Sequence, residues 1–517
     1  MTEPALLIRM NPADNVAVVA NDGGLREGTT VDGLALRHHV PQAHKVALAP
    51  LSAGDPVRRY GAVIGYAKES IPAGGLVNET NLELPHAPSL ESLTFAGRAA
   101  KAVEPLNGYA FRGFRNDDGS VGTRNILAIT NTVQCVSGIV GHAVERIRCE
   151  LLPRFPHVDD VVALDHTYGC GVAIDAPGAA IPIRTLHNIA RNPNFAGLTM
   201  VVSLGCEKLQ PSMLFPETFD TLPDISKPAS DPAGLVILQD ESHVGFEAMI
   251  GSILQTSERQ LTLLDRRRRK RCPASDLVVG LQCGGSDSLS GVTANPALGH
   301  AADLVVRAGG TVIFSEVTEV RDGIDQLIRR AASPEIAAEL ARQMEWYDHY
   351  LSCGQSDRSA NTTPGNKKGG LSNVVEKALG SIAKSGSMPI NGVIPPGERA
   401  QGSGLLFAAT PASDFICGTL QLAAGMNVHV FTTGQGTPYG LAEVPVVKVA
   451  SRSELAKRWH DLMDIDAGRI VSAGQTIESM GQSMFEKMLA IASGERTCAE
   501  RLGLHNQLAL FNPGPVT

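Results

Sequence analysis

Four cysteines follow apolar runs of the sequence directly, at the places where loops would leave buried strands. They are Cys135, Cys170, Cys206 and Cys283, and histidine or acidic residues stand beside most of them. Thiolates and imidazoles favour transition metals, whereas Mg²⁺ prefers oxygen ligands. No CxxC or HExxH spacing is present, so a mixed site for a divalent transition metal is favoured over a structural zinc site. For any one cysteine, a small buried residue is the alternative interpretation.

A glycine- and lysine-rich segment at residues 364–370 is a candidate anion site. It carries Lys367 and Lys368, and an amphipathic helix is predicted to follow from Leu371 to about Lys384. Free N–H groups at a helix N-terminus, together with the helix dipole, attract anions. The Walker A spacing is absent, so this is not a nucleotide-binding P-loop. An ordinary surface loop is the alternative.

Histidines gather near the N-terminus, where His44 and Lys45 stand at the start of a predicted strand, shortly after His38 and His39. Histidine has the ordinary pKa nearest neutrality, so it suits proton transfer. The pair His44–Lys45 is therefore a candidate catalytic element, with an exposed histidine of no function as the alternative.

The elements that must position these residues are strands of a parallel sheet. Apolar, β-branched runs recur from about residue 110, and helix-like sequence often follows them. They lie at residues 125–130, 161–164, 200–204, 277–281, 311–314, 405–408 and 428–431. Such alternation predicts a mostly parallel sheet covered on both faces. Ligands bind beyond the carboxyl ends of strands in sheets of this kind, which is where the cysteines would lie.

The first hundred residues have a different pattern, with short apolar runs at 16–20, 45–49 and 62–67 between glycine- and proline-containing turns. That pattern predicts a small β-barrel or β-clip. A Pro/Asp/Ser-rich patch at 221–234, a helix from Phe246 to Leu264 and a basic run from Arg266 to Arg271 mark a further boundary. A chain of 517 residues is too long to fold around a single hydrophobic core. We therefore expect an α/β protein with a β-clip domain (1–100), a second α/β domain (101–270) and a C-terminal α/β catalytic domain (271–517).

The net charge of −8 argues against nucleic-acid binding, and the basic run is better explained as a solvated helix end or a domain junction. No run approaches the ~18 apolar residues of a membrane span. An odd number of cysteines, nine in a long chain, does not form a disulfide framework. These features predict a cytoplasmic protein without nucleic-acid or membrane partners.

Many segments of the chain, as a set, resemble the galactarate/altronate dehydratase family over nearly the full length. The segments are Pro41–Leu48, Asp117–Asn125, His166–Gly171, Gly205–Gln210, Gln282–Gly291, Phe314–Asp322, Asp357–Asn361, Lys367–Lys368, Ala409–Asp414 and Leu504–Asn506. The tail, Leu510–Pro513 and Pro515–Thr517, resembles the galactarate branch.

The resemblance implies an N-terminal SAF-type β-clip and a hydro-lyase that removes water from galactarate to give 5-dehydro-4-deoxy-glucarate. It also implies ferrous iron or a similar divalent ion. Such a reaction needs a base for the proton beside a carboxylate, an acid for the departing hydroxide, and positive charge for the enolate-like intermediate.

The residues suggest how these roles are filled. We predict His44 or His166 as acid or base. Cations that can hold the two carboxylates of a sugar diacid are Lys45, Lys208, Arg358, Lys367 and Lys368. The candidates for metal ligands or their supporting residues are Cys170, Cys206, Glu207, Cys283 and Glu316.

Three alternatives stay open at this point. The substrate could be altronate or another aldonate, which has one carboxylate. The strand-end cysteines could hold an iron–sulfur cluster instead of a single ion. A sugar-acid binding protein without catalysis is the alternative from another class. We expect a homo-oligomer, most simply a dimer.

Overall fold

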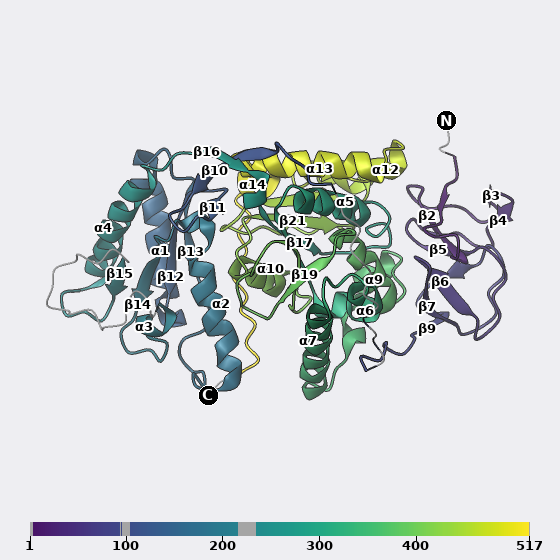
Figure 1. Cartoon of the computed structure of the whole chain (residues 1–517), viewed down its shortest axis with the longest axis horizontal. Coiled ribbons are helices and arrows are strands. Elements are labelled where there is room, and N and C mark those ends of the chain that lie inside the picture. The colour runs from purple at the N-terminus through teal and green to yellow at the C-terminus, as the bar shows by residue number, and fades with distance from the viewer. Residues whose placement is uncertain (1–3, 92, 94, 96–103, 216–233, 516–517) are drawn as a thin grey trace.

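The computed structural model describes residues 4–91, 93, 95, 104–215 and 234–515. Three sheet-based domains lie in a row, with the C-terminal domain between the other two (Figure 1). Most of the Pro/Asp/Ser-rich patch and part of the connector after residue 86 lie outside the described residues. Among the described helices, none is both long and apolar enough to cross a membrane.

The N-terminal β domain is built from short antiparallel strands, as predicted. One sheet has the order β1-β2-β5-β8, a second has the order β6-β7-β9, and β3 pairs with β4. The strands are β1 (Leu7–Ile8), β2 (Val16–Val19), β3 (Thr30–Val31), β4 (Leu34–Ala35), β5 (Lys45–Ala47), β6 (Pro56–Arg59), β7 (Ala62–Ala67), β8 (Leu76–Val77) and β9 (Leu82–Glu83). Part of its core continues onto Val374, Val375 and Leu379 of the C-terminal domain, so the two domains share a hydrophobic contact.

The second domain, here called the small-sheet domain, contains a parallel sheet of order β13-β12-β14-β15. Its strands are β12 (Ile126–Asn131), β13 (Asp160–Leu164), β14 (Met200–Ser203) and β15 (Leu235–Ile237). Its helices are α1 (Ser137–Arg146), α2 (Ala180–Ala190), α3 (Pro211–Leu214) and α4 (Phe246–Leu264). The buried strands are almost wholly apolar because helices cover both faces.

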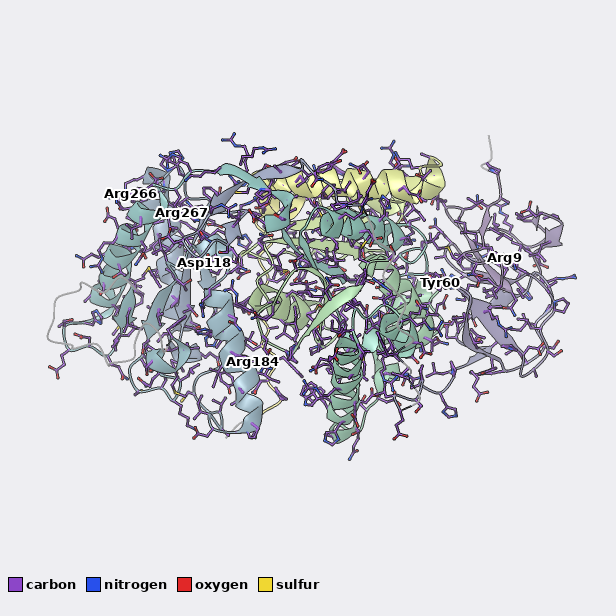
Figure 2. The ribbon with its side chains drawn as sticks, in the orientation of Figure 1. Arg9, Tyr60, Asp118, Arg184, Arg266 and Arg267 are labelled. Atoms are coloured by element: carbon purple, nitrogen blue, oxygen red, sulfur yellow. The ribbon has the colours of Figure 1, made fainter. Side chains whose placement is uncertain are left out.

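The basic run after α4 is a domain junction. Strand β10 (Ala110–Arg115) pairs antiparallel with β11 (Val121–Gly122) and with β16 (Lys270–Pro273). The guanidinium groups of Arg267 and Arg269 lie 5.3 and 4.6 Å from the ring centre of Phe114. Arg266 and Arg267 are labelled at this junction in Figure 2.

The C-terminal or large-sheet domain has seven parallel strands in the order β19-β20-β18-β17-β21-β22-β23. They are β17 (Val278–Cys283), β18 (Thr311–Ser315), β19 (Ile390–Ile394), β20 (Gly404–Ala408), β21 (Val428–Thr433), β22 (Val446–Ala450) and β23 (Ile465–Asp466). The helices are α5 (Ala294–Arg307), α6 (Ile324–Ile328), α7 (Pro334–Cys353), α8 (Pro364–Lys368), α9 (Val374–Ile382), α10 (Asp414–Ala423), α11 (Ser453–Arg458), α12 (Arg469–Ser472), α13 (Ile477–Ala492) and α14 (Cys498–Leu502). The predicted fold class, a small β domain followed by a mostly parallel α/β region, is confirmed.

The small-sheet and large-sheet domains pack through α2 and α10, whose apolar residues share one core. The side chain of Asn192, just after α2, donates to Met426 O, just after α10, over 2.9 Å. Arg184 of α2, labelled in Figure 2, donates to Pro396 O over 2.7 Å.

Candidate functional site

The residues predicted from sequence fall into two groups in different parts of the molecule. Five lie at the carboxyl edge of the small sheet: His166, Cys170, Cys206, Glu207 and Lys208. The others lie at the carboxyl edge of the large sheet or where the N-terminal domain docks on it: His44, Lys45, Cys283, Glu316, Arg358, Lys367 and Lys368. Because the large-sheet domain separates the N-terminal domain from the small-sheet domain (Figure 1), one chain does not gather all twelve into one site.

His166 is a buried residue at the small-sheet edge, and both of its ring nitrogens are engaged. Its Nε2 lies 2.7 Å from Asn131 O, and its Nδ1 accepts from the backbone N–H of Tyr168 over 3.1 Å. A carbonyl only accepts, so the proton is on Nε2 and the ring is neutral. Burial lowers the pKa of His166 to about 4. His166 therefore holds the loop after β13 against the end of β12.

Glu207 is buried, and its carboxylate accepts four hydrogen bonds. It accepts from the hydroxyls of Thr132 and Ser203 and from the backbone N–H groups of Leu204 and Gly205. Burial alone would raise the pKa of Glu207, but these hydrogen bonds bring the pKa below its ordinary value. The carboxylate is therefore ionised and joins the loop after β14 to the end of β12.

The exposed groups at this edge are the ones that a ligand can reach. Cys170 and Cys206 are free and exposed, and so is Cys135 in the loop after β12. The side chain of Gln239 donates to Cys206 Sγ over 3.3 Å. Lys208 is exposed and donates from Nζ to Val172 O over 3.0 Å. Exposed thiols and the ammonium group of Lys208 thus lie at the same edge of the small sheet.

His243, which the sequence analysis missed, stands in the loop that follows β15 at the same edge. Its Nδ1 lies 3.3 Å from Leu238 O, so Nδ1 donates there, and in the neutral ring Nε2 is the nitrogen with the lone pair. The same loop contains Gln239, which contacts Cys206. The signal that could have found His243 is its place after a short apolar run, Leu235–Leu238, at the edge of the sheet.

At the large-sheet edge, Glu316 follows β18 with a left-handed backbone (φ 80°) and is fully buried. Its Oε2 lies 2.8 Å from Lys384 Nζ, while Glu319 pairs with Lys377 over 2.8 Å. Burial raises the pKa of Glu316 to about 8, an effect that Glu319 increases and Lys384 opposes. Ser381 completes this buried network by donating to Glu319.

Cys283 is buried beside this network, and its Sγ lies 3.0 Å from Ser286 Oγ. Burial raises the pKa of the Cys283 thiol, so it is neutral at ordinary pH. Cys283, Lys377 and Ser381 line a cavity of only about 10 Å³, room for roughly one water molecule. The cavity is too small for a sugar acid.

Lys45 takes part in a buried ion triad between domains. Its Nζ lies 2.9 Å from Glu376 Oε2 and 2.7 Å from Gly370 O, and Arg59 pairs with the other oxygen of Glu376. Tyr60, labelled in Figure 2, lies next to Arg59 where the N-terminal domain faces the large-sheet domain. Lys45 thus fastens the N-terminal domain to α9.

The N-terminus of α9 is not open to an anion, which corrects the predicted cradle. The side chain of Asn373 accepts from Glu376 N, and Glu376 Oε2 accepts from Ser372 N. All nine residues of α9 are buried, so its polar side faces the charge network instead of solvent.

The remaining predicted cations are placed as follows. Arg358 forms a two-oxygen salt bridge with Asp322 over 2.9 and 2.8 Å and donates to Pro85 O. Lys367 and Lys368 are exposed on α8. His44 is half-buried, with Nδ1 3.2 Å from Gln42 O, and burial lowers its pKa. Their roles in substrate binding or proton transfer stay predictions.

The predicted metal candidates do not form one centre. Cys283 and Glu316 belong to the large-sheet domain, whereas Cys170, Cys206 and Glu207 belong to the small-sheet domain. The Glu207 carboxylate already accepts four hydrogen bonds, three of them on Oε1. Within the described ranges, no group of three or more His, Cys, Asp or Glu side chains is arranged around a single ion. The five-residue set therefore does not fit a mononuclear site.

Three family models match this chain in succession. They are the SAF domain of altronate/galactarate dehydratase (residues 5–85), the second domain of D-galactarate dehydratase/altronate hydrolase (113–264) and the C-terminal domain of D-galactarate/altronate dehydratase (274–516). These ranges follow the three domains described above.

Curated relatives match over the full length. Galactarate dehydratase (L-threo-forming) of Escherichia coli is 56% identical, over 100% of this chain and 98% of its own length. Altronate dehydratase of E. coli is 34% identical, and that of Bacillus subtilis is 30% identical, each over 98% of this chain and 99% of its own length. On its three successive domains and its full-length relatives, the chain belongs to the galactarate/altronate dehydratase family of sugar-acid dehydratases.

Proposed function

We propose that this chain is a hydro-lyase that removes water from galactarate to give a 5-dehydro-4-deoxy sugar diacid. The observation that carries the choice of substrate is the 56% identity to galactarate dehydratase over the whole chain, against 34% and 30% for two altronate dehydratases. Galactarate has a carboxylate at each end, whereas altronate has one.

We place the reaction at the carboxyl edge of the small sheet. There, exposed thiols, the exposed Lys208 and the imidazole of His243 gather on loops that contact one another. Lys45, Arg358 and Glu316 belong to buried or nearly buried ion pairs. This arrangement supports the small-sheet edge as the place where a sugar acid binds.

In this proposal the side chains share the chemistry as follows. The ammonium of Lys208 holds a substrate carboxylate and favours the negative charge that develops beside it. His243 Nε2 accepts the proton from the carbon next to that carboxylate. The bond to the neighbouring hydroxyl then breaks, the hydroxide leaves as water after protonation, and the resulting enol becomes the keto acid.

The remaining expectations are kept as proposals. Ferrous iron is proposed because the family resemblance implies it. A homodimer is proposed because most protein oligomers are symmetric assemblies of identical chains. A cytoplasmic location is proposed because all nine cysteines are free, which suits a reducing compartment.

The experiment measures keto-acid formation from galactarate and from altronate by anaerobically purified protein supplied with ferrous iron. We expect turnover on galactarate to exceed that on altronate clearly. Faster turnover on altronate would change the substrate but keep the reaction. Binding of galactarate without turnover would leave a sugar-acid binding protein and overturn the proposal.

A histidine comparison tests the placement of the reaction. His243→Gln should lower kcat by roughly 10²–10⁴-fold, as expected for the loss of a general base. His39→Gln, on the exposed surface of the N-terminal domain, is the control. The change His44→Gln tests the rival site: a large loss there, with none at His243, would move the reaction to the interface between the N-terminal and large-sheet domains.

A further inference from the structure

The C-terminal segment, residues 504–515, lies in the seam between the small-sheet and large-sheet domains. It follows α14, contains no described helix or strand, and runs along the seam to the start of α2, where Figure 1 draws it as the yellow trace. Its Leu508 is buried in the core that α2 and α10 share. Since the segment has no ladder of hydrogen bonds of its own, its place depends on contacts with the two domains.

Two contacts anchor the C-terminal segment to the large-sheet domain. Asn506 and Gly440 form a reciprocal pair: Asn506 N donates to Gly440 O, and Gly440 N donates to Asn506 Oδ1, each over 3.0 Å. Phe511 is 3% exposed and lies edge-on to Trp346 and Tyr350 of α7, with ring centroids 6.1 and 5.2 Å apart. Aromatic pairs in this geometry are favourable, so Phe511 is an apolar anchor close to the end of the segment.

A stiff turn follows Phe511. Pro513 and Pro515 each fix their own φ, and the N–H of Gly514 donates to Asn512 Oδ1 over 3.1 Å. The four residues after the aromatic anchor therefore have little conformational freedom, and a shift of Phe511 is passed on to them.

This turn touches the loop that follows β13 (residues 165–179), which is the loop of Cys170. A Cβ on Gly178 would lie 2.8 Å from both the N and the Cα of Gly514, so the two backbones are in direct contact. The N–H of Ala173 donates to Pro515 O over 3.3 Å. Through the C-terminal segment, the large-sheet domain thus reaches the second half of a loop of the small-sheet domain.

The first half of the same loop is fixed within the small-sheet domain. His166 binds Asn131 O, and a Cβ on Gly169 would lie 2.0 Å from Thr132 O. The φ of Gly169, 110°, also favours glycine there. The loop is therefore held from two sides, by the small sheet in its first half and by the C-terminal segment in its second half.

The position of Lys208 depends on this loop. Its Nζ donates to Val172 O over 3.0 Å, and Val172 directly precedes Ala173, the residue that binds Pro515 O. An ammonium group has three donors, so the carbonyl takes one and sets the direction of the other two. A series of contacts thus runs from Pro515 to the ammonium group of Lys208.

We infer that the C-terminal segment positions Lys208 for the substrate carboxylate, an inference that rests on the proposed function. The segment connects the place of Phe511 in the large-sheet core to a cation at the edge of the small sheet. It is a positioning element, because it acts through the loop after β13. Loosening the segment weakens substrate binding, which is measured as a raised KM. It leaves kcat nearly unchanged, because the proposed base, His243, stands on a different loop.

The test loosens the anchor in the full-length protein and follows both the loop and the substrate. Phe511→Ala should raise KM for galactarate by roughly 3–10-fold and change kcat by less than about twofold. Hydrogen–deuterium exchange should become roughly tenfold faster at residues 171–179, which include the N–H of Ala173. Exchange at the loop after β12 should stay unchanged. Combined with Lys208→Met, Phe511→Ala should raise KM no further than Lys208→Met alone, because both changes act through one contact.

Two further variants separate positioning from stability. Phe511→Leu keeps an apolar side chain at the anchor and should restore most of the wild-type KM. Met488→Ala removes a buried side chain of the same core from α13, so it should lower the melting temperature by a similar amount without changing KM. Equal rises in KM for Met488→Ala and Phe511→Ala would overturn the inference, since KM would then follow stability alone.

The variants of Lys208 and Phe511 also separate this inference from the proposed function. If Lys208→Met raises KM but Phe511→Ala does not, or if exchange at residues 171–179 is unchanged, the proposed function stands and the inference is refuted. If Lys208→Met leaves KM unchanged, the placement of the substrate in the proposed function is wrong, and the inference falls with it.

Discussion

The ring of His166 donates from Nε2 to the backbone carbonyl of Asn131 over 2.7 Å, which joins the loop after β13 to the last residue of β12. Its other nitrogen accepts from the N–H of Tyr168 in its own loop. The ring can make both bonds only while it is neutral, because a protonated Nδ1 would face a donor. His166 was predicted to transfer protons. In this structure its neutral ring holds the loop of Cys170 in place through these two hydrogen bonds, so the support depends on pH.

The first prediction concerns pH and stability. The pKa of His166 is lowered from 6.5 to about 4 in the folded protein, so the unfolded chain takes up a proton first as the pH falls. The contribution of His166 to the free energy of unfolding is therefore fully present above pH 6.5. It falls by about 3 kcal/mol in total between about pH 6.5 and pH 4.

Thermal unfolding of the wild type and of His166→Gln from pH 7.5 to pH 4.5 checks this. The difference in melting temperature between the two proteins should shrink as the pH falls, because glutamine does not titrate. A difference that stays constant over this range would show that the His166 ring does not titrate as stated.

The second prediction concerns Gly169. In Gly169→Ala the new methyl group would collide with Thr132 O and the backbone would keep an unfavourable φ. We expect a loss of stability of about 1–3 kcal/mol, measured by chemical unfolding. Gly141→Ala in α1 is the matched control, since nothing lies within 4 Å of its added Cβ and alanine favours a helix. Equal stability of the two variants would contradict the tight contact between the loops.

The third prediction concerns substrate affinity. Lys208→Met should raise KM for galactarate by roughly 10–100-fold, because a hydrogen bond to a charged group contributes about 1.5–3 kcal/mol. Lys68→Met is a matched control, since Lys68 is also exposed and also donates to a backbone carbonyl, that of Thr80. Lys367→Met tests the sequence prediction for α8. An increase in KM there, with none for Lys208, would favour the large-sheet edge.

Most of the fold could be predicted from the sequence because its signals are local. The helix predicted from Phe246 to Leu264 is α4 with those same bounds, and the run at residues 62–67 is β7. The apolar runs at 161–164 and 311–314 are strands of two separate parallel sheets. Periodicity and turn residues carry this information within a few residues.

The site was less predictable, because partners distant in sequence decide what a charged residue does. Lys45 looked like a catalytic cation, but Glu376, 331 residues away, pairs with it. Glu316 looked like a metal ligand, but Lys384 pairs with it from the end of a helix expected to be half exposed. Sequence placed such residues at strand ends correctly, yet it contained no signal that their charges were already neutralised.

The last prediction concerns the ion triad that joins the N-terminal domain to α9. Glu376 is fully buried and pairs with both Lys45 and Arg59. Burial, which would raise the pKa of Glu376, is outweighed by these two cations. Glu376→Ala leaves two buried cations without the carboxylate that pairs with them, which should cost about 3–5 kcal/mol. Since Lys45 and Arg59 belong to the N-terminal domain, that domain should detach first. Limited proteolysis of the connector after residue 86 should therefore accelerate before the rest of the chain unfolds.

Glu398→Ala removes a more exposed pair with Arg184, so it should shift stability by less than about 1 kcal/mol and leave proteolysis unchanged. If both variants were cleaved at the same rate, the docking of the N-terminal domain would depend on its apolar contact with α9 and not on the buried charges.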